Sequence, residues 1–235
     1  GIFLDESENS IIQTCWITRA DPGILVAVHF ANETNIKILD NYCFDNKGSG
    51  IEANPSGEGC VIKGNHVYDN GVSGILSLNA TGGIISNNII YGNVQYGILA
   101  YGNFSDFSGN RVYENGKTGM YFVSINRSTI NGNAVYNNEE HGIYIEGHWN
   151  VCDGNVCEAN DFSNTASFDG IVVAVGDRNV ISSNRCTNND RYEINVKDAI
   201  CDRNLIHGNV VFGTDHVGTI NDNGANTLQA DNQAL

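Results

Sequence analysis

The feature that most constrains the fold is a short motif that the chain repeats at an almost fixed interval. It has the form Asn-x-φ-Tyr-x-Asn-x-x-x-Gly-φ, where φ is an apolar residue. Four complete copies begin at Asn65, Asn88, Asn110 and Asn133. The period of 22 to 23 residues is typical of a solenoid, in which each repeat is one turn of the chain and packs on its neighbours.

Weaker copies extend the repeat in both directions to about nine rungs of 22–29 residues. Each rung carries three apolar columns, which are rich in Ile and Val. One lies three residues before the first Asn, one two residues after it, and one directly after the Gly. Three short β-branched segments per turn predict an all-β chain, a single-stranded right-handed parallel β-helix with three sheets. Leucine-rich repeats have a similar period, but their Leu columns are missing here.

The Asn columns have a physical explanation in this fold. Asn tolerates left-handed backbone conformations at corners, and stacked amides can hydrogen-bond from rung to rung. The Tyr of the motif belongs to an aromatic column, which we interpret as a structural ladder: Phe44, Tyr68, Tyr91, Tyr113 and Tyr136.

Composition limits the classes of partner. The 235 residues include 27 acidic and 12 basic side chains, for a net charge of −15, which disfavours nucleic acid. No apolar run reaches the length of a membrane span, so we expect neither nucleic acid nor a membrane as partner. The chain begins in the middle of a repeat, which suggests a mature form or a fragment of a longer protein.

The seven cysteines form no Cys-x-x-Cys pair, and several fall in core columns. We therefore predict no zinc site and no other metal site. Cys157 and Cys186 occupy equivalent places in successive rungs, where we expect buried thiols that fill a ladder. No cofactor is required by this pattern. Ca²⁺ is left open as a ligand of the acidic turns, without an ordered calcium ladder.

The repeats resemble those of the right-handed parallel β-helix superfamily. The Asn-rich form is similar to the repeats of mannuronan epimerase modules, polysaccharide lyases and periplasmic copper-processing β-helix proteins. The resemblance covers nearly the whole chain and implies the fold. It carries no catalytic residue across, because the epimerase Asp-Pro-His-Glu stretch has no counterpart at Gly50 to Pro55.

Two regions depart from the repeat. A longer rung inserts residues 161–169 before Gly170, and solenoid insertions are often binding loops. The residues after Ile220 are polar and unpatterned. We predict a β-helix over 1–220 and a polar C-terminal tail or cap remnant over 221–235.

Outward-facing positions after the Gly-φ step are apolar over five rungs, from Leu76 to Val172. An exposed stripe of this kind usually marks a contact surface, and its aromatic rings could stack on sugars. The substrate-binding residues that we predict along this face and the neighbouring loop are Leu99, Tyr121, Tyr144, His148, Asp161 and Arg191.

Ionisable residues gather at the edge of the same strands. Carboxylates beside His and Tyr side chains are the groups that glycoside hydrolysis or β-elimination needs. The candidate catalytic residues are Glu140, His141, Tyr144, Glu146 and Asp169.

The function predicted from the sequence is that of an extracellular or cell-surface protein, with the periplasm as a further option, that acts on a polysaccharide. It binds an extended glycan on one face and, as an enzyme, would be a polysaccharide lyase or glycoside hydrolase. The alternative is a non-catalytic β-helix that serves as a spike, adhesin or assembly module. A homo-oligomer or further domains would then cover the ends of the solenoid.

Overall fold

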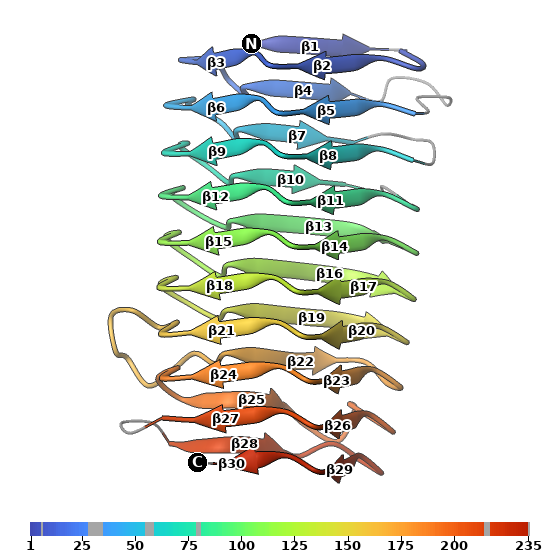
Figure 1. Cartoon of the computed structure of the whole chain (residues 1–235), viewed down its shortest axis with the longest axis vertical. Coiled ribbons are helices and arrows are strands. Elements are labelled where there is room, and N and C mark those ends of the chain that lie inside the picture. The colour runs from blue at the N-terminus through green and yellow to red at the C-terminus, as the bar shows by residue number, and fades with distance from the viewer. Residues whose placement is uncertain (6, 28–34, 55–58, 79–80, 214–216, 235) are drawn as a thin grey trace.

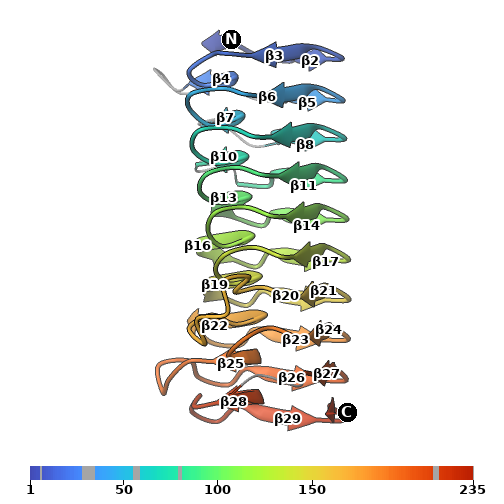
Figure 2. The ribbon, with the colours of Figure 1, turned by 90° about the vertical axis from the view of Figure 1, so that its left-hand side faces the viewer.

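The computed structural model describes residues 1–5, 7–27, 35–54, 59–78, 81–213 and 217–234. Within these residues the protein is a right-handed parallel β-helix of about nine turns, and the fold predicted from the sequence is confirmed. Figures 1 and 2 show a straight stack of rungs with the two termini at opposite ends. None of the described elements is an apolar helix of membrane-spanning length.

Each rung contributes one strand to each of three parallel sheets, and each described sheet has ten strands. Sheet A consists of β1 (Ile2–Asp5), β4 (Ile24–Ala27), β7 (Ile51–Ala53), β10 (Ile75–Ser77), β13 (Ile98–Asn103), β16 (Met120–Asn126), β19 (Ile143–His148), β22 (Ile171–Val175), β25 (Tyr192–Val196) and β28 (Gly218–Asp222). Its strands are longest in β13, β16 and β19.

Sheet B consists of β2 (Ile11–Gln13), β5 (Lys37–Leu39), β8 (Val61–Lys63), β11 (Ile84–Ser86), β14 (Asp106–Ser108), β17 (Thr129–Asn131), β20 (Val151–Asp153), β23 (Val180–Ser182), β26 (Leu205–His207) and β29 (Leu228–Ala230). Sheet C consists of β3 (Trp16–Thr18), β6 (Tyr42–Phe44), β9 (His66–Tyr68), β12 (Ile89–Tyr91), β15 (Arg111–Tyr113), β18 (Ala134–Tyr136), β21 (Val156–Glu158), β24 (Arg185–Thr187), β27 (Val210–Phe212) and β30 (Gln233–Ala234).

The interior is filled by the three predicted apolar columns. Ile75, Ile98, Met120 and Ile143 follow one another in register in sheet A, and none of them is exposed to solvent. Cys157 and Cys186 also pair in register, and both are buried free thiols. Stacking of equivalent strands thus makes each apolar column run parallel to the solenoid axis and face the interior.

Buried asparagines close the corners, as the sequence predicts. We name each corner by the sheets that it connects, in chain order. At the B/C corner, the side-chain amide of Asn65 donates to Oδ1 of Asn88 at 3.0 Å, and its backbone N–H donates to the same oxygen at 2.9 Å. The C/A corner repeats this pattern with Asn138 and Asn160. These bonds satisfy backbone groups that would otherwise be buried without a partner.

The aromatic column outside sheet C is also a ladder. Its successive ring centroids, from Phe44 to Tyr136, lie 4.9 to 5.0 Å apart, with interplanar angles of 2° to 8°. The rings therefore stack face to face from rung to rung and support the sheet from outside.

The C-terminal boundary differs from the prediction. Where a tail was expected after Ile220, β29 and β30 continue sheets B and C, and Asn232 accepts two hydrogen bonds from Asn209. The apolar pattern could not reveal this rung, because Gln229 and Ala234 stand where earlier rungs carry Ile and Val.

Candidate functional site

The outer face of sheet A carries the predicted apolar stripe, but over fewer rungs than expected. Leu76, Leu99, Tyr121 and Tyr144 are half-buried neighbours in successive strands. Val172, the fifth member, is only 1% exposed, so it belongs to the interior of the packed face rather than to an open surface. The accessible stripe therefore ends at Tyr144.

Aromatic side chains form a continuous cluster around this end of the stripe. Tyr96 lies 5.2 Å from Tyr121, and Tyr121 lies edge-on to Tyr144 at 4.8 Å between ring centroids. His141 extends the cluster, with its ring 5.2 Å from Tyr144 and 5.0 Å from Phe168 of the inserted loop. The cluster presents ring faces and edges on one side of the solenoid, which is the kind of surface on which sugar rings stack.

Tyr121 and Glu146 form a polar pair within the cluster. The Tyr121 hydroxyl donates to Oε1 of Glu146 at 3.3 Å. Burial, together with the charge of Glu146, raises the pKa of Tyr121 far above its usual range. Burial also raises the pKa of Tyr144. Both phenols therefore stay protonated at neutral pH and act as hydrogen-bond donors rather than as bases.

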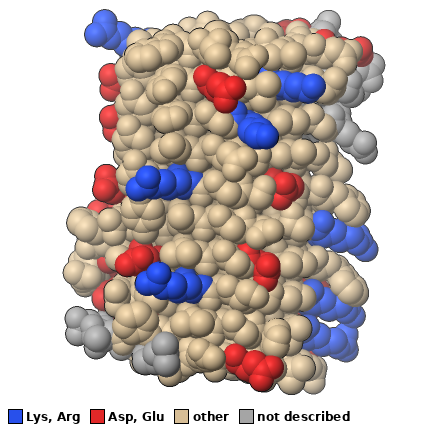
Figure 3. Space-filling model, viewed as in Figure 1, with Lys and Arg blue, Asp and Glu red and all other residues tan. Residues whose placement is uncertain are grey.

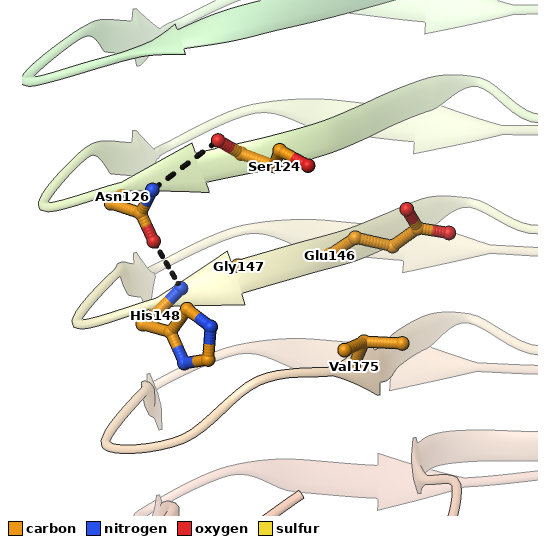
Figure 4. A pocket seen from close by; sticks show the side chains of 6 residues that line it. All are labelled: Ser124, Asn126, Glu146, Gly147, His148 and Val175. Carbon is orange, nitrogen blue, oxygen red and sulfur yellow. Dashed lines mark hydrogen bonds between the residues drawn. The ribbon is translucent and has the colours of Figure 1, made fainter. Parts of the chain in front are cut away.

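A shallow pocket of about 260 Å³ opens beside this pair, at the C-terminal ends of β16 and β19. Figure 4 shows its lining, which consists of Ser124, Asn126, Glu146, Gly147, His148 and Val175. The floor depends on Gly147, since a Cβ at this position would lie 1.7 Å from the carbonyl oxygen of Ile125. Only a glycine allows the two strands to approach this closely.

His148 stands at the rim of the pocket and is held from two sides. Its backbone N–H donates to Oδ1 of Asn126 at 2.9 Å, and its Nδ1 contacts the carboxylate of Asp177. Asp177 also binds Nη1 of Arg178 at 2.5 Å. The hydrogen bond with His148 and the positive charge of Arg178 help to outweigh the effect of burial and lower the pKa of Asp177.

His141 and Glu140 are oriented by neighbouring rungs. Nδ1 of His141 accepts the backbone N–H of Asp169 at 2.9 Å. Burial, aided by the charges of Arg191 and Lys197, lowers the pKa of His141 to about 4, so the ring is neutral at pH 7. Glu140 accepts a hydrogen bond from the Thr118 hydroxyl at 3.1 Å.

Asp169 was predicted as a catalytic residue, but its contacts give it a structural role. Its carboxylate is fully buried and forms a bidentate pair with Arg191, at 2.7 and 2.5 Å. It also accepts bonds from the backbone of Tyr192 and the side chain of Asn195. These four donors occupy the lone pairs of the carboxylate, which is shielded from solvent. Arg191, a predicted substrate-binding residue, is engaged in the same pair.

Asp161 is likewise occupied within the inserted loop. It is 1% exposed and accepts hydrogen bonds from Thr165, Ser167 and Phe168. The loop that carries residues 161–169, which projects at the side of the stack between β21 and β22 in Figure 1, is thus folded around this carboxylate. Of the predicted residues, the structure brings together Tyr121, Tyr144, Glu146 and, through the pocket, His148; Glu140 and His141 lie on the flank, and Leu99 one rung away.

Sequence reasoning missed Ser124, Asn126 and Asp177, as well as the third corner of the solenoid. A polar column at this A/B corner contains Ser105, Ser128, Asn150, Asn179 and Asn204, which hydrogen-bond from rung to rung. The signal was present, since each stands five residues before the first Asn of its rung. It was hidden because Ile36 and Cys60 hold the same place in earlier rungs.

The fold and the site together define a right-handed parallel β-helix with an aromatic cluster and a polar pocket on one sheet. Solved structures of this class are similar to it. The Azotobacter vinelandii mannuronan C-5 epimerase AlgE6 A-module matches with a TM-score of 0.77 and 16% identity, over 99% of this chain and 75% of that one. The periplasmic alginate epimerase AlgG matches with a TM-score of 0.67 and 15% identity, over 100% of this chain and 76% of that one. Bacteriophage CBA120 tailspike protein 2 matches with a TM-score of 0.63 and 13% identity, over 94% of this chain and 38% of that one.

Family models identify the chain more closely. Residues 1–168 match the family described as periplasmic copper-binding protein (NosD), and residues 106–234 match the right-handed β-helix region. The chain therefore belongs to the NosD family of β-helix proteins. No curated protein matches the sequence.

The family description raises the question of copper, and the described residues do not fit it. Copper favours His, Cys and Met ligands. Throughout the described ranges, His, Cys, Asp and Glu nowhere form a group of three that could hold a metal ion. Met120 is fully buried, and Cys43, Cys152 and Cys186 lie in the solenoid interior. We derive no step through copper, and Ca²⁺ at the acidic turns stays a prediction.

Proposed function

We propose that this protein is a glycan-recognition β-helix that binds an extended polysaccharide along the outer face of sheet A, in the periplasm or outside the cell. The observation that carries the proposal is the Tyr96–Tyr121–Tyr144 cluster beside the Glu146 pocket. Ring faces provide stacking surface, while Glu146 and the phenol hydroxyls provide the directed hydrogen bonds that sugar hydroxyls need.

The similarity to a mannuronan C-5 epimerase and an alginate epimerase supports this choice of ligand class. The location is supported by the periplasmic family to which the chain belongs and by its similarity to AlgG, a periplasmic epimerase.

The geometry supports binding more directly than cleavage. Glycoside hydrolysis uses two carboxyl groups on opposite sides of the bond. Among the described pocket residues, Glu146 is the one carboxylate, while nearby Asp177 is held by His148 and Arg178. Lyase or hydrolase activity therefore stays a prediction, for which Glu146 and His148 are the residues to test.

A panel of polysaccharides, read for binding and for new reducing ends or unsaturated uronates, tests the proposal. We expect Tyr121→Ala with Tyr144→Ala to abolish binding, and Tyr121→Phe to weaken it by about tenfold, since one hydrogen bond to a charged group is lost. Tyr91→Ala in the sheet C ladder is the matched control and should bind normally.

Binding that survives the double substitution would refute the site. An absence of binding by the unaltered protein to every glycan, together with a stable oligomer in solution, would refute the function and favour the assembly module. Turnover that is lost in Glu146→Gln would add an enzymatic role.

A further inference from the structure

The A/B corner carries a column of large side chains that the proposed function does not use. In five consecutive rungs, the residue just before the buried polar ladder is Phe104, Arg127, Trp149, Arg178 or Arg203. Phe104 is 58% and Trp149 49% exposed, and Arg203 is 56% exposed at its side chain. At a strand spacing of ~4.8 Å, the column extends for about 19 Å parallel to the solenoid axis.

The backbone conformation makes these residue types unexpected. All five adopt positive φ, between 53° and 62°. The same corner position in the four preceding rungs is filled by Asn9, Asn35, Gly59 and Gly82, which also have positive φ. Asn and Gly adopt this conformation at low cost, whereas bulky side chains are strained in it. A strained choice that is repeated over five rungs points to a function for the side chains.

The side chains are arranged in aromatic and cationic pairs. The guanidinium carbon of Arg127 lies 5.7 Å from the centroid of Phe104, and that of Arg178 lies 4.7 Å from the centroid of Trp149. Stacking on a ring orients a guanidinium, and the N–H groups along its edge are the donors that a carboxylate needs.

Two carboxylates of the protein already bind some of these guanidinium N–H groups. Asp177 binds Nη1 of Arg178, and Asp202 lies 3.4 Å from Nε of Arg203. A guanidinium has five N–H donors, so each of these contacts leaves donors for a ligand.

The column is also a basic region on a protein that is acidic overall. The protein has a net charge of −15 and only 12 basic residues, of which three are in this column. Figure 3 shows basic side chains along the right-hand edge of the lower half and acidic side chains along the left-hand edge. The right-hand edge is the A/B corner, because β13, β16 and β19 run toward it in Figure 1.

We propose that this corner column is a second glycan site, which binds a uronate-bearing polysaccharide that runs parallel to the solenoid axis. The arginines hold sugar carboxylates through charge-assisted hydrogen bonds, and Trp149 and Phe104 stack on sugar rings. Tyr121 lies near the start of β16, and Arg127 follows the end of this strand six residues further on, roughly 20 Å away, so the column is separate from the tyrosine cluster. A single-stranded nucleic acid would also meet rings and cations, but the repulsion of the acidic protein acts on its denser charge more strongly.

Isothermal titration with oligogalacturonate and with its neutral methyl ester tests the proposal. We expect the unaltered protein to bind the acid form more tightly, with an affinity that falls at high salt. Arg127→Gln with Arg178→Gln should lower the affinity for the acid form by about tenfold or more. Lys63→Gln with Arg185→Gln removes the same charge from sheets B and C and should leave the affinity unchanged. Trp149→Asn should fold normally, because Asn tolerates the corner conformation, and should also bind weakly.

The corner site would be overturned by equal affinity for the acid and its methyl ester, by an equal loss in the Lys63 and Arg185 control, or by equally tight binding of oligothymidylate. The two proposals can fail separately. Loss of acid-form binding in the Arg127 and Arg178 variant but not in Tyr121→Ala with Tyr144→Ala supports the corner alone, and the reverse supports the tyrosine cluster alone. An unaltered protein that binds neither probe contradicts the corner site.

Discussion

The C/A and A/B corners solve the same folding problem with different side chains. Both turn the chain with a residue of positive φ, and both bury a polar ladder directly behind it. At the C/A corner the ladder is asparagine from Asn46 to Asn189, and the outward residues include Asp45, Asp69 and Glu114. At the A/B corner the ladder is serine and then asparagine, and the outward column is aromatic and basic.

This difference shows that the inward corner residues support the fold, whereas the outward corner residues determine the chemistry of the surface. The inward amides form the bonds that the backbone requires, so they are restricted to a few residue types. The outward corner residue makes no such bond, and its side chain is open to use.

Removing one amide should destabilise the C/A corner more than the A/B corner. The Asn138 side chain makes five hydrogen bonds, to Val112, Tyr136 and Asn160 and from Asn115. At about 1 kcal/mol for each bond, Asn138→Ala should lower the free energy of unfolding by about 5 kcal/mol. The Ser128 hydroxyl makes two, so Ser128→Ala should lower it by about 2 kcal/mol.

Urea unfolding measures both changes. Asn131→Ala, at an exposed position of sheet B, is the control and should change stability by less than about 0.5 kcal/mol. Equal effects at Asn138 and Ser128 would mean that the two ladders contribute alike, and the comparison of the corners would fail.

The C/A ladder ends in a titratable group, the carboxyl of Glu193. The A/B ladder residues Ser105 to Asn204 include no titratable side chain. Glu193 accepts hydrogen bonds from the backbone and the side chain of Asn189, and burial raises the pKa of Glu193 to about 7. The folded state therefore holds a proton that the unfolded state releases, and stability falls as pH rises from about 4.5 to 7. Glu193→Gln should be more stable than the unaltered protein by about 3 kcal/mol at pH 8, and the gain should vanish near pH 4.5.

Thermal unfolding at the two pH values checks this prediction. Glu158→Gln, on the outside of sheet C, removes an equal charge and should show a small effect at both. A gain in Glu193→Gln that does not change with pH would show that packing, and not the proton, is responsible.

Titration of His141 should change stability with pH in the direction opposite to that of Glu193, because His141 makes the protein less stable at low pH. Burial lowers the pKa of His141 to about 4, so the unfolded state takes up a proton more readily than the folded state below pH 6.5. Stability should therefore fall by up to about 3 kcal/mol as pH decreases from 6.5 to 4. His141→Asn retains an acceptor for the Asp169 N–H and should lose this dependence.

The measurement is the difference in unfolding free energy between His141→Asn and the unaltered protein at pH 7 and pH 4.5. A difference that stays constant would place the ring in solvent, contrary to its exposed fraction of 13%.

The smallest effect concerns the strained corner residues themselves. Ala159 at the C/A corner and Arg127 at the A/B corner have φ of 52° and 53°. Ala159→Gly should stabilise the protein by about 0.5–1 kcal/mol through relief of this strain. Arg127→Gly should stabilise it less, because the contact with Phe104 is lost, and it alone should weaken oligogalacturonate binding. Loss of binding in both variants would contradict a specific role of the A/B column.

Much of the fold could be predicted from the repeat, because identical rungs place identical residues in one column. The Asn ladders, the aromatic stack and the Cys157–Cys186 pair all follow from equivalent positions in successive rungs. The last rung could not be recognised, since the polar Gln229 and the small Ala234 do not continue the Ile and Val columns. The site was predicted in part: Tyr121, Tyr144 and Glu146 share one face because alternate residues of a strand point the same way.

The sequence by itself determined the period, the three sheets and the residues that face inward, because a solenoid converts sequence spacing directly into position. Which carboxylate lines the surface pocket depends on the three-dimensional contacts. Asp161 and Asp169 look like Glu146 in the sequence, but contacts with Thr165 and Arg191 occupy the first two. Those contacts depend on how the inserted loop folds over neighbouring rungs, and hydrogen-bond partners brought together in this way leave no periodic signal.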